Sequence, residues 1–95
     1  MPALLIVPTK TFKDDLNEFF DDFERLDLDD SKVERFYSEA NKALESAQSG
    51  RFKPVILITI GSPFLVALVA AKLSRVGNFL LAERTPRRYR VFDCP

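Results

Sequence analysis

The chain has 95 residues, 46% hydrophobic and 29% charged, and its net charge at pH 7 is zero. This size and balance are typical of one globular domain over residues 1–95 and exclude a disordered or fibrous protein. The chain has no histidine, so the usual general base near neutral pH and the commonest metal ligand are missing. We therefore expect a non-enzymatic protein with no catalytic residues, no metal site and no cofactor.

The zero net charge conceals an asymmetry along the chain. Residues 1–50 carry twelve acidic and six basic side chains, whereas residues 51–95 carry two acidic and eight basic ones. A folded molecule can then present an acidic and a basic face, which favours self-association or binding to a charged protein. Two separately solvated faces explain the same pattern and remain the alternative.

The cysteine content indicates the cellular compartment. Cys94 is the single cysteine and cannot form an intrachain disulfide, so a secreted, disulfide-stabilised domain is excluded. The apolar residues 3–7 lack a preceding basic region and are too short for a signal peptide. We expect a reducing, cytoplasmic location.

The first quarter of the chain predicts a strand followed by an acidic helix. Residues 3–7 are an apolar run that is typical of a buried strand, and Pro8 ends it. Thr11 and Asp14 then resemble a capping box, which predicts a helix start. The apolar stripe of this predicted helix is Leu16, Phe19, Phe20, Phe23 and Leu26.

Residues 31–50 predict a second helix. Ser31 and Glu34 form a capping box, and Gly50 suits the position just after the helix end. The acidic residues 27–30 break the helical pattern before it. Two consecutive helices joined by a short loop should therefore form a hairpin or a bent pair.

An uncharged run of seventeen residues, 55–71, decides the rest of the fold. Gly61-Ser62-Pro63 interrupts it, and this tripeptide suits a tight turn, a helix cap and a first helical residue, in that order. We predict a buried strand over residues 55–60 and an apolar helix from Pro63 to about Arg75. The alternative is one membrane-spanning helix, for which seventeen residues is the lower limit.

The C-terminal segment predicts a β-hairpin. Residues 79–82 and 89–93 read as strands, and the turn at residues 85–87 joins them. The element order is then β-α-α-β-α-β-β. This order predicts a small α/β domain with a single-layer, mostly parallel four-stranded sheet and the C-terminal hairpin at its edge.

Two loops form the candidate ligand site. Ligands of open parallel sheets bind beyond the carboxyl ends of the strands, and both loops lead into predicted helix N-termini that favour an anion such as phosphate. Simple capping and turn roles explain the same residues, and neither a Walker A motif nor a GxGxxG motif is present. The candidate residues are Thr9, Lys10, Thr11, Gly61 and Ser62, to which Lys13 can add positive charge.

The basic hairpin is the candidate interaction surface. Clustered arginines beside a tyrosine can bind a phosphate backbone or an acidic protein, but zero net charge and the acidic first half argue against nucleic acid. A solvated edge hairpin is the alternative. The candidate residues are Arg84, Arg87, Arg88, Tyr89 and Arg90.

Three functions remain open. We favour a protein-interaction or assembly module that uses the apolar third helix, the acidic helical face and the basic hairpin, because a buried pocket is hard to build in so short a chain. The first alternative is a Rossmann-like sensor of a small ligand or nucleotide, since a strand–Gly-Ser-Pro–helix turn is common in such folds. The second alternative is a membrane-anchored protein with its span at residues 55–71.

Overall fold

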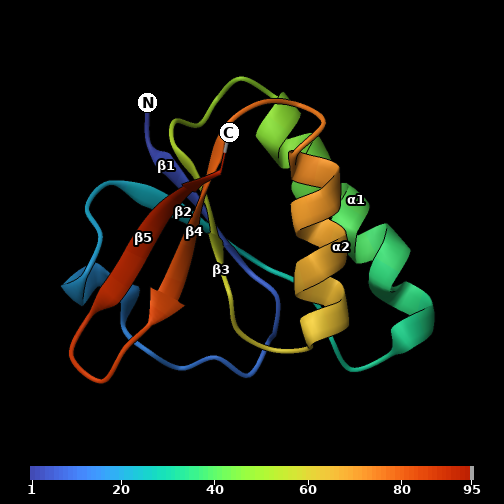
Figure 1. Cartoon of the computed structure of the whole chain (residues 1–95), viewed down its shortest axis with the longest axis horizontal. Coiled ribbons are helices and arrows are strands. Elements are labelled where there is room, and N and C mark those ends of the chain that lie inside the picture. The colour runs from blue at the N-terminus through green and yellow to red at the C-terminus, as the bar shows by residue number, and fades with distance from the viewer. Residues whose placement is uncertain (95) are drawn as a thin grey trace.

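Five strands and two α-helices make up the structure, a computed structural model that describes residues 1–94 (Figure 1). The strands are β1 (Ala3–Val7), β2 (Phe23–Asp27), β3 (Val55–Ile58), β4 (Phe79–Arg84) and β5 (Tyr89–Cys94). The helices are α1 (Phe36–Gln48) and α2 (Pro63–Leu73), and short 3-10 helices lie at Leu16–Glu18 and Val33–Arg35.

The strands form one mixed sheet in the order β2-β1-β3-β4-β5. The strands β1, β2, β3 and β4 run parallel to one another, whereas β5 is antiparallel to β4 and lies at the edge. All five residues of β1 are buried. This burial follows from its place inside the sheet, because a parallel strand covered on both faces needs a continuous apolar run.

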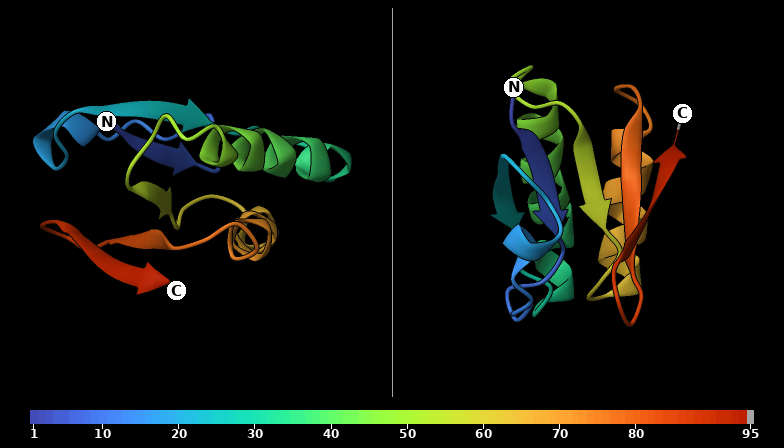
Figure 2. Two further views of the ribbon diagram at one scale, coloured as in Figure 1. Left: turned by 90° about the horizontal axis from the view of Figure 1, so that it is seen from above. Right: turned by 90° about the vertical axis from the view of Figure 1, so that its left-hand side faces the viewer.

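Both helices cover one face of the sheet, and the connection from β1 to β2 covers the other (Figure 2). The connections through α1 and α2 move along the sheet toward β4, whereas the connection from β1 to β2 moves the opposite way. Right-handed crossovers that move in opposite directions must lie on opposite faces. Handedness therefore decides which segment covers which face.

The core has two halves, one on each face of the sheet. On the helix side, Leu4, Ile6 and Leu57 pack against α1 and α2. On the other side, Leu5, Val7 and Ile56 pack against aromatic residues of β2, of β5 and of the connection from β1 to β2. We call these the aromatic cluster, which consists of Phe12, Phe19, Phe20, Phe23 and Tyr89.

The predicted acidic helix up to Leu26 is wrong, and a fifth strand forms instead. The segment contains only the turn Leu16–Glu18 and then β2, which pairs with β1 over five residues. The phenylalanines do face the core, but they cover the sheet as an irregular segment, and Asp22 turns the chain with φ +43°. The spacing of these phenylalanines is compatible with an amphipathic helix and equally with an irregular segment that covers the sheet. The acidic side chains therefore lie on a loop and on β2 instead of one helical face.

The second helix forms, but its start differs from the prediction. A 3-10 turn, Val33–Arg35, precedes α1, and Ser31 does not cap it, because its hydroxyl donates to Asp29 Oδ1 at 2.6 Å. Gly50 follows the C-cap residue with φ +76°, as predicted.

The uncharged run is divided into β3 and α2, as predicted. Gly61 adopts φ +88°, Ser62 occupies the N-cap position and Pro63 begins the helix, which ends at Leu73 instead of Arg75. Across residues 1–94, no helix is both long enough and apolar enough to cross a bilayer. The predicted alternative of one continuous span is therefore wrong for this segment.

Candidate functional site

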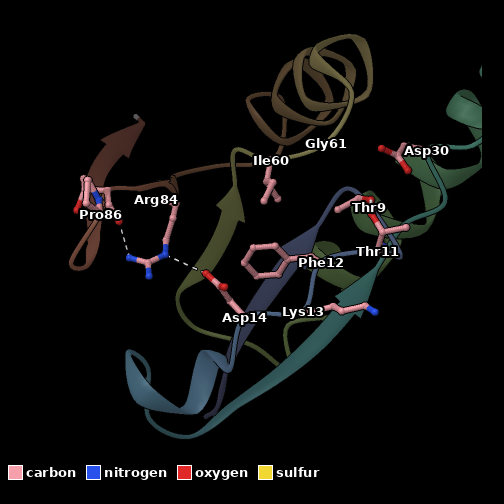
Figure 3. A pocket seen from close by; sticks show the side chains of 11 residues that line it. Thr9, Thr11, Phe12, Lys13, Asp14, Asp30, Ile60, Gly61, Arg84 and Pro86 are labelled. Atoms are coloured by element: carbon pink, nitrogen blue, oxygen red, sulfur yellow. Dashed lines mark hydrogen bonds and ion pairs between the residues drawn. The ribbon is translucent and has the colours of Figure 1, made fainter.

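A cleft of about 720 Å³ opens at the carboxyl edge of the sheet (Figure 3). The chain leaves β1 toward one face and leaves β3 toward the other, so the two loops diverge and leave a crevice between them. Such a switch point is where open α/β sheets bind ligands. The loop after β1 supplies Thr9 and residues 11–14, the loop after β3 supplies Ile60 and Gly61, the hairpin supplies residues 84–86, and Asp30 completes the lining.

The structure brings part of the predicted ligand site together. Thr9, Thr11 and Gly61 line the cleft. Lys10 is exposed outside the lining, where its charge helps to lower the pKa of Asp29 after the hydrogen bonds from Ser31. Ser62 also lies outside the lining, at the start of α2.

Gly61 holds the two loops in contact. A Cβ atom at this position would lie 2.5 Å from the carbonyl oxygen of Pro8 and 3.1 Å from Cβ of Thr9. Only a residue without a side chain permits that approach at φ +88°. The structure therefore gives Gly61 a clear role in shaping the base of the cleft.

Asp30 already supplies an anion at the N-terminus of α2. Its Oδ2 atom accepts a hydrogen bond from the amide of Ser62 at 3.3 Å. A carboxylate at this position is stabilised by the positive end of the helix dipole. A ligand phosphate at the same amide would have to displace Asp30, so the opposite side of the cleft is the better place for an anionic group.

Arg84 is held in place by several groups at once. Its Nε donates to Asp14 Oδ2 at 2.9 Å, and its Nη1 donates to the carbonyl of Arg88 at 3.1 Å. Its guanidinium also lies 4.8 Å from the ring centroid of Phe19. These contacts neutralise and orient Arg84, so it forms a fixed wall of the cleft.

Tyr89 belongs to the core of the molecule. Its side chain is 8% exposed, its ring meets that of Phe19 edge to face at 5.2 Å, and its hydroxyl donates to Asp14 Oδ2 at 3.4 Å. Burial first, and then the charge of Asp14, raise the pKa of Tyr89 to about 12. The phenol is therefore neutral near pH 7 and its ring is unavailable for stacking on a base.

The remaining hairpin residues are exposed. Arg87 and Arg88 lie at the turn, and Arg90 lies on β5 with its Nε 3.9 Å from Glu83 Oε1. An exposed ion pair at this distance is weak. The structure thus divides the predicted basic surface into two side chains that build the fold and three that face solvent.

Several cleft residues were outside the predicted ligand set. Phe12 lies in the middle of the cleft, near Ile60 (Figure 3). The turn after β4 supplies Thr85 and Pro86, which the sequence could have indicated because a third parallel strand also ends at this edge. No local sequence pattern indicated that Asp30 would line the cleft, because only the tertiary fold brings it to α2.

Comparisons of the chain with protein-family models, with curated proteins and with solved structures found no significant match. In the part of the chain that the structure describes, no three histidine, cysteine or acidic side chains gather where they could hold a metal ion. The fold and the cleft define the class, a small α/β domain with an open crevice at a switch point.

Proposed function

We propose that the domain binds a small phosphate-bearing molecule, such as a nucleotide, in the switch-point cleft. The observation that supports this most is the place of the cleft, where the chain leaves β1 and β3 toward opposite faces of the sheet. Its volume of about 720 Å³ also lies within the usual range for small-molecule sites.

The lining offers complementary groups to such a ligand. The Lys13 ammonium can pair with phosphate. The hydroxyls of Thr9 and Thr11 hydrogen-bond to each other at 3.0 Å, which leaves one hydroxyl proton to donate to a phosphate oxygen. The ring of Phe12 and the side chain of Ile60 provide apolar area for a flat group. A phosphate near Lys13 and a flat group on Phe12 fit the charges better than the reverse arrangement.

Asp30 and Arg84 limit the orientation of the ligand. The carboxylate of Asp30 repels a phosphate but can accept a hydrogen bond from a ligand hydroxyl or amine. Arg84 is paired with Asp14 and adds little net charge. Lys13 is therefore the side chain on which phosphate affinity should depend most.

The test is a thermal-shift and calorimetric titration of the full chain with inorganic phosphate, AMP, ATP and adenosine. AMP or ATP should raise Tm with concentration, because a ligand that binds the native state stabilises it. Lys13→Ala should weaken binding by about tenfold, the value of one charge-assisted hydrogen bond. Lys10→Ala, which removes an exposed lysine outside the cleft, is the matched control.

Three results would contradict this function. The first is a Tm that none of the four compounds changes. The second is an equal loss of affinity in Lys13→Ala and Lys10→Ala, since general charge attraction would then explain the binding. The third is adenosine that binds as tightly as AMP, since the phosphate group would then contribute nothing to the affinity.

A second proposal retains the protein-interaction hypothesis, because large apolar side chains stay exposed. In α2, only Leu65, Val69 and Leu73 are buried, so this helix, whose one charged residue is Lys72 in the last turn, presents a mostly apolar outer surface on which Phe64 is 81% exposed. Exposed apolar surface is typical of protein contacts. The exposed large apolar residues are Met1, Val33, Tyr37, Phe64, Val76, Val91 and Phe92.

A further inference from the structure

We infer that this domain self-associates head to tail, with the free edge of β5 in one copy pairing antiparallel with the free edge of β2 in the next. The partner is a second copy of this chain. This self-association does not depend on the cleft or on its ligand. It gives the protein-interaction hypothesis a definite surface and a definite partner.

The two strands lie at opposite ends of the sheet (Figure 2). Within residues 1–94, β2 pairs with β1 alone and β5 pairs with β4 alone. Each therefore carries one row of backbone N–H and C=O groups without a partner strand. Such an edge is a template for pairing with another chain.

The backbone groups of β5 that face outward follow from its register. The carbonyl of Ala82 accepts from the amide of Thr59, so the backbone of Ala82 is directed toward β3. Val91 lies opposite Ala82, and in an antiparallel pair its N–H and C=O must then point to the free edge. By alternation, Tyr89 and Asp93 also present their backbone groups there.

The backbone groups of β2 that face the free edge are deduced in the same way. The amide of Ala3 donates to the carbonyl of Asp22, and the amide of Leu28 donates to the carbonyl of Val7. Even-numbered residues of this segment therefore bond to β1. The backbone groups of the odd-numbered residues, with Arg25 at the centre, are left for the free edge.

The strand directions suit a head-to-tail contact. The strand β2 runs parallel to β1, β3 and β4, whereas β5 runs the opposite way. Two copies in the same orientation therefore bring β5 of one antiparallel to β2 of the other. This arrangement also keeps the helices of both copies on the same face of the extended sheet.

The charges of the two edges are complementary. The exposed residues Asp21, Asp22, Glu24 and Asp27 surround Arg25 on and before β2, whereas the exposed residues Arg87, Arg88 and Arg90 outnumber Asp93 on and before β5. A β5–β2 contact joins opposite charges, whereas a β5–β5 contact would bring the arginines together. The contact also covers Val91 and Phe92, which are 48% and 43% exposed.

The contact is heterologous, because it joins two different surfaces. Such contacts produce rings or open chains instead of a closed two-fold dimer. The mass in solution should therefore rise with protein concentration beyond that of a dimer, and fall with added salt as the exposed charges are screened.

The test is light scattering of the full chain and two charge-reversal variants at low and high salt. Arg90→Glu makes β5 acidic and Glu24→Lys makes β2 basic, so each variant alone should associate at least about tenfold more weakly. An equimolar mixture of the two should recover the association, since each variant's altered edge meets an edge of opposite charge. Recovery also shows that both variants are folded.

Arg75→Glu is the matched control, because it makes the same charge change at an exposed site near the end of α2 and should not alter the mass. A monomer at every concentration would overturn the inference. So would an association that Glu24→Lys leaves unchanged, since β2 would then lie outside the contact.

Discussion

At the residue scale, Gly61 decides whether the two loops of the cleft can meet. Gly61→Ala should destabilise the protein by at least about 3 kcal/mol, through the cost of a left-handed conformation and a collision with the backbone of Pro8. Urea denaturation followed by circular dichroism measures this loss.

Gly50 provides the matched control for Gly61. Its φ of +76° is similar, but a Cβ atom there would meet nothing within 4 Å. Gly50→Ala should therefore cost only about 1 kcal/mol, the conformational part alone. Equal losses in the two variants would show that the contact between the loops contributes nothing.

At the scale of elements, Glu39 fastens α1 to the segment that follows β2. Its side chain is 5% exposed and accepts from the Asp29 amide at 2.6 Å and from the Lys42 ammonium at 2.7 Å. Burial alone would raise the pKa of Glu39, but these two partners outweigh burial and lower it. The ionised carboxylate is therefore the form that the fold stabilises.

Glu39→Gln should destabilise the protein by about 1–2 kcal/mol at pH 7, because the charge-assisted part of both contacts is lost. Because the pKa of Glu39 is lowered in the fold, its contribution is present above pH 4.5 and disappears as the pH falls through the folded value. Thermal melts at pH 7 and pH 3 measure both effects. Glu45→Gln, at an exposed site on the same helix, should change neither.

At the scale of the whole molecule, Tyr89 links the hairpin, the aromatic cluster and the loop after β1. Its pKa of about 12 in the fold exceeds the usual 10, so its contribution to stability is complete below pH 10 and is lost as the pH rises toward 12. The slope in this window should reach about 1.4 kcal/mol for each pH unit.

Denaturation with urea between pH 8 and pH 11.5 tests this dependence. Tyr89→Phe should lower stability at pH 8 and flatten the loss above pH 10. Tyr37→Phe, which alters an exposed tyrosine, should keep the wild-type slope. If stability fell with pH as steeply in Tyr89→Phe as in the wild type, groups other than Tyr89 would be responsible for the loss of stability at alkaline pH.

Local chemistry explains the parts of the fold that were predicted correctly. Gly61, Ser62 and Pro63 have backbone preferences that act within three residues, so the division into β3 and α2 was readable from the chain. The same holds for Gly50 and for the C-terminal hairpin. Thr9, Thr11 and Gly61 were placed at one edge of the sheet because parallel strands end together.

Most of the errors involve partners that are distant in sequence. The phenylalanine spacing before β2 suits a helix, and the choice of a strand depends on its pairing with β1. Ser31 was expected to cap a helix, yet its hydroxyl bonds Asp29. Arg84 and Tyr89 were expected to form a surface, but Tyr89 is buried in the core, and Arg84 is held by an ion pair with Asp14, which is 70 residues away in sequence.

By itself, then, the sequence determined the turn at residues 61–63, the elements on either side of it and the absence of a histidine-based site. The tertiary structure decided the fifth strand, the second covered face and the presence of Asp30 at the start of α2. The physical reason is that backbone preferences act over a few residues, whereas sheet pairing and charge placement join segments that only folding brings together.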